Sequence, residues 1–199
     1  MKTLSKQLEK LSSELPQGEK AVIAIAGKMA SGKNYISAEL EKLGWKAIDA
    51  DKLVHSAINQ ATEQIYETFK NQAEVQKISI LNEDKTINRR ELGKLLFANP
   101  ELLAKQEQIV YPIITQMVKD FILQNSKTII NATVLYKTPD LLDLCQLVLY
   151  VKANFFKRVT RIRRRDSMAF SQIFSRMNSQ KNLFKLYKDT GKKIIVIKN

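Results

Sequence analysis

Short apolar segments alternate along the chain with segments of helical periodicity. The strand-like segments are Val22 to Ala26, Trp45 to Ile48, Ile129 to Ile130, Leu147 to Val151 and Ile194 to Ile197. Short apolar runs of this kind are typical of strands that are buried on both faces, as in a parallel sheet. Their alternation with helical patterns predicts an α/β fold, an open and mostly parallel sheet with helices on both faces.

Two long helical blocks interrupt this alternation. Residues 52–126 are almost wholly helical in pattern, with one turn expected from Leu81 to Ile87. Within this block Pro112 should start or bend a helix. Residues 154–180 form a second helical block, which is strongly basic. We therefore expect a sheet core of about residues 20–51, 127–153 and 181–199, with residues 52–126 carried on it as an insert.

The first residues of the chain form an apolar stripe. Its members are Leu4, Leu8, Leu11 and Leu15. Because polar residues separate them at helical spacing, we expect a packing helix over residues 1–18 and not a signal sequence.

No segment approaches the ~20 apolar residues that a membrane span needs. Cys145 is the single cysteine, which excludes a disulfide framework, and its apolar surroundings predict a buried thiol. Together these features predict a cytoplasmic protein with no membrane partner.

Positive charge gathers towards the C-terminal end of the 199-residue chain, whose formal net charge is +13. The last 45 residues contain thirteen lysines and arginines but only two acidic residues, Asp166 and Asp189. Such a segment attracts polyanions, and charge alone does not choose between nucleic acid and a phosphate-rich small molecule. No nucleic-acid-binding module, zinc site or aromatic stacking motif accompanies the charge, so nucleic acid is the less favoured partner.

A candidate phosphate-binding loop follows the first strand-like segment. Its sequence, Gly-Lys-Met-Ala-Ser-Gly-Lys-Asn, matches G-x-x-x-x-G-K and leads into a helical pattern that begins at Lys33. Glycines let backbone N–H groups curl towards phosphate oxygens, and the following helix adds its positive N-terminal end. Lys33 can then reach the β- and γ-phosphates. The alternative is a plain strand-to-helix turn that contains two glycines. The expected nucleotide contacts are Gly27, Lys28, Met29, Ala30, Ser31, Gly32, Lys33 and Asn34.

Asn34 stands where this loop usually has a Ser or Thr whose hydroxyl coordinates Mg²⁺. An amide oxygen also binds a hard cation, but it is a neutral ligand on a longer side chain. We therefore expect Asn34 to bind the metal more weakly or in a shifted position.

Two carboxylates, Asp49 and Asp51, follow the second strand-like segment, at the edge where parallel sheets bind ligands. Alternation along an extended chain would place both on the same face. One of the two can then orient the Mg²⁺ shell through water, while the other accepts a proton from an attacking hydroxyl. Asp51 also precedes a helical pattern, so a helix-capping role is the alternative. His55, one helical turn after Asp51, contacts a substrate phosphate or assists proton transfer, and the alternative is a histidine that faces solvent or packs in the fold.

Arg161 and Arg165 lie one helical turn apart in the basic block, and Arg176 lies on the next segment. Arginines that close over a transferring phosphoryl group stabilise its charge, and a closing segment also excludes water. We therefore expect Arg161 and Arg165 to converge on one phosphate chain, because they face the same way on the helix. The alternative is a solvated basic face or a nucleic-acid contact strip.

From about residue 20 onwards, these residues resemble the pattern of the dephospho-coenzyme A kinase family. The shared features are Val22 to Gly27 entering the loop, Leu43-Gly44, Ile48-Asp-Ala-Asp51, His55, Ile87-Asn-Arg-Arg-Glu-Leu-Gly93, Phe97, Ile109-Val-Tyr-Pro-Ile113, Arg161-x-x-x-Arg165-Asp166 and Arg176-x-x-x-Gln180. The sequence departs from the pattern at Lys28 and Ala30, which replace glycines, and at Asn34. It also departs at Thr133 to Lys137, where Pro-Leu-Leu-Phe-Glu is usual.

The resemblance implies transfer of the γ-phosphate of ATP, with Mg²⁺, to the ribose 3′-hydroxyl of dephospho-coenzyme A, the last step of coenzyme A synthesis. It implies that Asp51 is the general base and that Lys33, Arg161 and Arg165 stabilise the transferring phosphoryl group. It also implies that His55 and Arg89 contact the acceptor, that residues 154–180 form a lid, and that Arg176 contacts the nucleotide.

The expected fold is one P-loop NTPase-type kinase domain with a helical acceptor-binding insert and a basic helical lid. Two alternatives stay open. One is another small-molecule P-loop kinase. The other is a catalytically impaired nucleotide-binding protein whose basic C-terminus binds nucleic acid.

Overall fold

The computed structural model describes residues 11, 14–166 and 169–199, and the chain divides into two compact units. The first unit comprises Met1–Asp51 and Val118–Asn199, and the second comprises Lys52–Met117. Most of the helix expected over residues 1–18 lies outside the described residues, although Leu11 and Leu15 are described and buried. None of the described helices is both long and apolar enough to cross a membrane.

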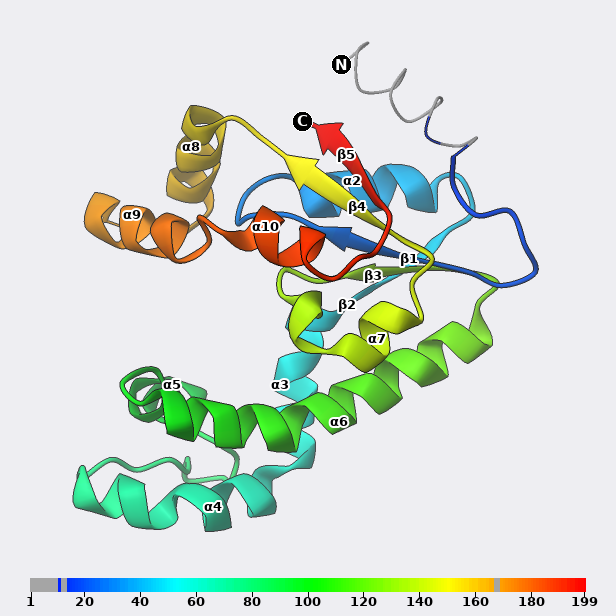
Figure 1. The fold of residues 1–199 in the computed structure, drawn as a ribbon. Helices are drawn as coiled ribbons and strands as arrows, with labels where there is room; N and C mark the ends of the chain where they lie inside the picture. Colours follow the sequence, from blue (N-terminus) through cyan, green and yellow to red (C-terminus); the bar gives the residue numbers. More distant parts are fainter. Residues whose placement is uncertain (1–10, 12–13, 167–168) are drawn as a thin grey trace. The chain divides into compact units, whose positions relative to one another are not determined.

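Five strands form the sheet of the first unit, and every pairing between them is parallel (Figure 1). In sheet order they are β2 (Lys46–Asp49), β3 (Lys127–Asn131), β1 (Ala21–Ala26), β4 (Leu147–Lys152) and β5 (Ile194–Lys198). The central strand β1 is buried at every residue, as expected for a parallel strand that is covered on both faces. The predicted parallel α/β sheet is confirmed.

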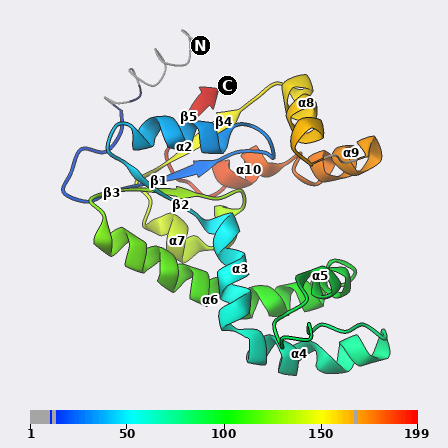
Figure 2. The ribbon, with the colours of Figure 1, turned by 180° about the vertical axis from the view of Figure 1, so that it is seen from behind.

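Helix α2 (Lys33–Glu41) covers one face of the sheet, and the short helix α7 (Pro139–Asp143) lies on the other (Figures 1 and 2). Alternate residues of β1, Ile23 and Ile25, point towards α2 and pack with Ile36 and Leu40. All four side chains are fully buried. Burial of each such side chain stabilises the fold by about 1.5–3 kcal/mol relative to exposure. This core fixes the carboxyl end of β1, from which the phosphate-binding loop departs.

Three helices follow β4 in the first unit. They are α8 (Phe155–Asp166), α9 (Phe170–Ser179) and α10 (Leu183–Lys188). A separate apolar cluster joins α8 to α9 through Ile162, Ile173 and Met177, and Met29 and Ala30 of the phosphate-binding loop pack against it. The basic block is therefore anchored on that loop.

The second unit is helical. It contains α4 (Thr62–Val75) and α5 (Arg89–Phe97), together with most of α3 (Ala50–Gln60) and of α6 (Pro100–Gln124). The turn expected from Leu81 to Ile87 is present, and an antiparallel bridge joins its two ends. Helix α5 starts after Asn88, whose side-chain oxygen accepts a hydrogen bond from the backbone N–H of Glu91 at 3.2 Å.

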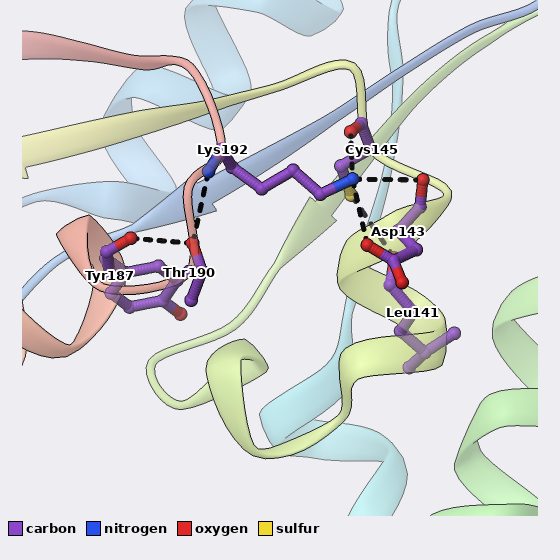
Figure 3. A network of polar contacts seen from close by, with 6 residues as sticks. All are labelled: Leu141, Asp143, Cys145, Tyr187, Thr190 and Lys192. Atoms are coloured by element: carbon purple, nitrogen blue, oxygen red, sulfur yellow. Dashed lines mark hydrogen bonds and ion pairs between the residues drawn. The ribbon is translucent and has the colours of Figure 1, made fainter.

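The corner between α7 and β4 is tied to the loop that precedes β5 (Figure 3). Lys192 Nζ lies 3.0 Å from Asp143 Oδ1 and donates to the carbonyl oxygens of Asp143 at 3.3 Å and Cys145 at 3.5 Å. Cys145 is buried as predicted, and its thiol donates to the carbonyl oxygen of Leu141 at 3.5 Å. Burial raises the pKa of this thiol to about 12, so it stays protonated at neutral pH.

Candidate active site

Residues 27–32 connect β1 to α2 at the carboxyl end of the central strand, and Lys33 and Asn34 begin α2. A Cβ atom on Gly27 would lie 2.5 Å from the carbonyl oxygen of Val151. Gly32 has a φ of 98°, and a Cβ atom there would lie 1.9 Å from Asn199 Nδ2. Gly27 is required because its backbone passes too close to that of Val151 for any side chain, and Gly32 because side-chain-bearing residues disfavour its backbone conformation.

The Lys33 ammonium group lies over this loop at the start of α2. Its Nζ donates to Thr133 Oγ1 at 2.9 Å and to the carbonyl oxygen of Gly27 at 3.3 Å. Burial lowers the pKa of Lys33, the nearby Asp51 and Asp49 carboxylates oppose that shift, and neighbouring arginines add to it. The phosphate oxygens of a nucleotide can replace the two acceptors that Lys33 uses here.

Asp51 lies in the first turn of α3 and not on an extended segment. The expectation that strand alternation places Asp49 and Asp51 on one face is therefore wrong. The reason is that β2 ends at Asp49 and the helix begins at Ala50. A carboxylate is favourable in the first turn, because it faces the positive end of the helix.

Thr133 contacts both of the charged groups just described. Its hydroxyl accepts from Lys33 Nζ and donates to Asp51 Oδ2 at 2.8 Å. Its backbone N–H donates to Asp51 Oδ1 at 3.2 Å and Oδ2 at 3.3 Å. Sequence reasoning noted Thr133 only as a departure from the family pattern. The signal that could have found it is its place two residues after β3, at the edge of the sheet where ligands bind.

A buried tyrosine holds Thr133 in place. The hydroxyl of Tyr187 donates to the carbonyl oxygen of Thr133 at 3.1 Å and accepts from the backbone N–H of Leu135 at 2.9 Å. The ring is fully buried, and this burial raises the pKa of Tyr187 well above its ordinary value. Tyr187 is therefore a neutral donor at physiological pH, and it fixes the backbone on which Thr133 stands.

The residues predicted to hold Mg²⁺ lie on both sides of Asn131. Asn34 Oδ1 accepts from Asn131 Nδ2 at 2.8 Å, and Asp49 is the register partner of Asn131 in the β2–β3 pairing. An amide oxygen that accepts one hydrogen bond keeps a second lone pair. Mg²⁺ typically uses one or two protein oxygens together with phosphates and waters. This donor set suits a hydrated Mg²⁺ ion that the nucleotide shares.

The predicted arginines differ in what they contact. Arg161 Nη1 donates to the carbonyl oxygens of Ala30 and Ser31, each at 3.2 Å. Arg165 pairs with Asp166, with Nε to Oδ1 at 2.6 Å and Nη2 to Oδ2 at 2.7 Å. The side chain of Arg165 is 64% exposed, so this pair is open to solvent. Arg176 lies exposed on α9.

Two of the predicted residues, Arg89 and His55, belong to the second unit. Arg89 begins α5 and lines a pocket of roughly 430 Å³. Polar side chains dominate the lining, which consists of Asn59, Asn82, Thr86, Ile87, Asn88, Arg89 and Arg90. His55 is exposed on α3 and does not line this pocket.

Sequence comparisons with known proteins point to one family. The family model for dephospho-CoA kinase matches residues 21–191. A dephospho-CoA kinase from Treponema denticola is 30% identical over 187 residues, which cover 91% of this chain and 83% of that protein. Two solved structures share the fold at 21% identity. Protein TT1252 from Thermus thermophilus has a TM-score of 0.73, with 92% of this chain and 90% of that chain covered. A dephospho-CoA kinase from Campylobacter jejuni has a TM-score of 0.59, with 92% and 89% covered.

Proposed function

The chain belongs to the dephospho-CoA kinase family, and we propose that it transfers the γ-phosphate of ATP to the ribose 3′-hydroxyl of dephospho-coenzyme A. The observation that carries this proposal is the joint contact of Lys33 and Asp51 with the Thr133 hydroxyl, beside the phosphate-binding loop. Phosphoryl transfer to an alcohol needs a cation at the phosphates and a base at the hydroxyl, held close together. We assign this reaction to the cytoplasm, where ATP is supplied.

Asp51 acts as the general base in this proposal. Two donors of Thr133, the hydroxyl and the backbone N–H, hold its carboxylate in one orientation. A carboxylate offers about four lone-pair positions, so acceptor capacity remains for the proton of the substrate hydroxyl. Asp51 is exposed, which leaves it accessible to an incoming alcohol.

Lys33, Arg161 and Arg165 stabilise the transferring phosphoryl group, and Arg176 contacts the nucleotide. Lys33 already lies among oxygen acceptors at 2.9 and 3.3 Å. Arg165 can exchange its partner Asp166 for a phosphate oxygen at little cost, because exposed ion pairs are weak. Residues 154–180 act as the lid that excludes water from the transfer.

Asn34 and Asp49 would hold Mg²⁺, which would neutralise negative charge on the phosphates when bound. The amide–amide hydrogen bond from Asn131 supports this role, because it orients the Asn34 oxygen. The expected consequence is a metal site that the nucleotide completes.

The acceptor-binding residues are His55 and Arg89, within the insert at residues 52–126. Arg89 belongs to a polar pocket that also contains Arg90, so two guanidinium groups are available to the phosphates of dephospho-coenzyme A. This pocket supports the role of Arg89. The role of His55 rests on the family pattern and its exposure.

Incubation with ATP, Mg²⁺ and dephospho-coenzyme A tests the proposal, with coenzyme A detected by mass. The unmodified protein should form coenzyme A, and Asp51→Asn should slow its formation by about 10²–10⁴-fold, as expected for loss of a general base. Lys33→Ala should abolish the formation of coenzyme A. Asp140→Asn, an exposed change on α7, should leave the rate unchanged. A protein that binds ATP but forms no coenzyme A contradicts the proposal, and salt-sensitive RNA binding would then favour the impaired alternative.

A further inference from the structure

The phosphate-binding loop is held from its outer side at Met29. Arg158 Nε donates to the carbonyl oxygen of Met29 at 2.8 Å, and Gln180 Oε1 accepts from the backbone N–H of Met29 at 2.7 Å. Arg158 lies on α8, and Gln180 is the C-cap residue of α9. Two side chains from two helices therefore hold both polar backbone groups of one loop residue.

The next carbonyl groups of the loop point the same way. Arg161 Nη1 bonds to the carbonyl oxygens of Ala30 and Ser31, and Asn199 Nδ2 donates to that of Ser31 at 2.9 Å. Across a trans peptide bond, a carbonyl group and the following N–H group point in opposite directions. The N–H groups of Ala30 and Gly32, which follow the carbonyls of Met29 and Ser31, therefore face away from α8, whereas the N–H of Ser31 donates to the carbonyl oxygen of Lys28 at 3.0 Å. N–H groups on the inner side of such a loop are the donors that bind phosphate oxygens.

The backbone in this region is strained. Ala30 has a φ of 58°, in the left-handed region that side-chain-bearing residues disfavour, and the family pattern has glycine there. Contacts on both sides of Ala30 must hold this conformation. Those contacts are the hydrogen bonds at Met29 and Ser31 and the apolar cluster that includes Ile162.

Burial of Arg158 has no evident benefit for stability. The residue is 6% exposed, and among the described residues its Nη2 atom has no hydrogen-bond partner although it is buried. Burial also lowers the pKa of Arg158. A buried guanidinium group with an unused donor weakens a fold, and an apolar residue of similar size would suit the position better. Its bond to Met29 therefore calls for a functional explanation.

We propose that Arg158 and Gln180 are positioning residues that hold the Met29 peptide groups and so pre-orient the N–H donors of the loop for the phosphate chain of ATP. They act through the loop backbone and need not touch the nucleotide. This inference rests on the proposed function only in placing ATP at the loop. It makes α8 and α9 determinants of nucleotide affinity, in addition to any movement of a lid.

Calorimetric titration with ATP and Mg²⁺, without acceptor, tests the inference. Gln180→Met removes the acceptor without changing charge, and Arg158→Lys keeps the charge but loses the Nε donor. Each change should weaken ATP binding about tenfold, the value of one lost hydrogen bond of about 1.4 kcal/mol. The matched control is Arg164→Lys, an exposed change on the same helix, which should alter affinity by less than about twofold.

Three further measurements separate positioning from a purely structural role. The thermal midpoint of Arg158→Lys should stay close to that of the unmodified protein, because Arg158 contributes little stability. The double variant should lose less affinity than the two single losses combined, since both side chains hold one residue. Inorganic tripolyphosphate should reproduce the ranking of the variants, because the effect lies at the phosphates.

Two outcomes would overturn the inference. These are unchanged ATP affinity in both variants, or affinity and thermal midpoint falling together in Arg158→Lys. A protein that binds ATP normally but makes no coenzyme A would contradict the proposed function alone, and affinity would still decide this inference.

Discussion

At the scale of single residues, the Thr133 hydroxyl joins the two charged groups on which phosphoryl transfer depends. Thr133→Val removes this hydroxyl but keeps the backbone N–H that also contacts Asp51. Loss of a hydrogen bond to a charged group costs about 1.5–3 kcal/mol, so kcat should fall by about tenfold or more. Thr133→Ser keeps the hydroxyl and should retain most of the rate. Equal kcat values for the Val and Ser variants would show that the hydroxyl does not contribute to the rate.

Asn34 offers a second test at this scale. Asn34→Thr replaces an amide oxygen, which Asn131 already engages, by a hydroxyl on a shorter side chain. A hydroxyl at this position is the usual Mg²⁺ ligand, so ATP binding should reach half-saturation at a lower Mg²⁺ concentration. Titration of Mg²⁺ at fixed ATP measures the change, and binding in the presence of EDTA is the control. No shift in the Mg²⁺ titration would contradict a metal role for Asn34.

The sequence could predict residues whose chemistry follows from their place in a motif. Lys33 and the two glycines of the loop belong to this group, because the strand–loop–helix context limits where they can lie. The partners of Arg158 and Gln180 could not be predicted. Their hydrogen bonds to Met29 join positions separated by 129 and 151 residues, and only the folded chain brings them together.

At the scale of elements, α6 starts at Pro100 and not at Pro112. Asn99 Oδ1 accepts from the backbone N–H of Glu101 at 2.9 Å, and Pro100 occupies the first turn, where its missing N–H costs nothing. The helix then runs from Pro100 to Gln124 without a break at Pro112. Of the two roles expected for Pro112, that it starts a helix or bends one, the first is wrong, because the capping residue lies earlier in the chain.

A proline inside a helix lacks one backbone donor and crowds the preceding turn. Pro112→Ala should therefore raise the free energy of unfolding by about 1 kcal/mol or more, after allowance for the greater freedom of the unfolded chain. Pro100→Ala is the matched control and should change stability by less, since Pro100 loses no helical hydrogen bond. Urea unfolding measures both variants. A destabilised Pro112→Ala variant would mean that α6 needs the proline.

Element boundaries were less predictable than element types. The strand expected over Trp45 to Ile48 is present, but it runs from Lys46 to Asp49 and the next helix starts at once. No turn residue marks this junction in the sequence. Tertiary pairing of β2 with β3 decides where the strand ends, and local pattern carries little of that information.

At the scale of the whole molecule, a buried thiol and two buried phenols make the stability of the fold sensitive to alkaline pH. Burial raises the pKa of Cys145 and of Tyr150 to about 12 in each case, and it raises that of Tyr187 further. In the unfolded chain these groups lose their protons at about pH 9–10, whereas the folded protein keeps them protonated. The unfolded state then binds fewer protons, so stability must fall as pH rises from about 9 towards 12.

Urea unfolding between pH 8 and pH 11 tests this expectation. Each group should contribute a loss of up to about 1.4 kcal/mol per pH unit within its window. Lys28 and Lys33 have lowered pKa values, so just below their ordinary pKa of 10.5 they make stability rise with pH. These two groups are fewer than the thiol and the two phenols that lower it. Cys145→Ala should flatten the profile above pH 9. A profile that stays level to pH 11 would contradict the burial of these groups.

The buried thiol of Cys145 also permits a measurement of local opening in the folded protein. Because the chain has one cysteine, and that side chain is 2% exposed, an alkylating dye can react only when the corner between α7 and β4 opens. Labelling rates at increasing dye concentration therefore separate how often this corner opens from how long it stays open, as amide exchange does for backbone groups. A cysteine introduced on the surface would react first, which permits attachment of one fluorophore while the native thiol stays silent.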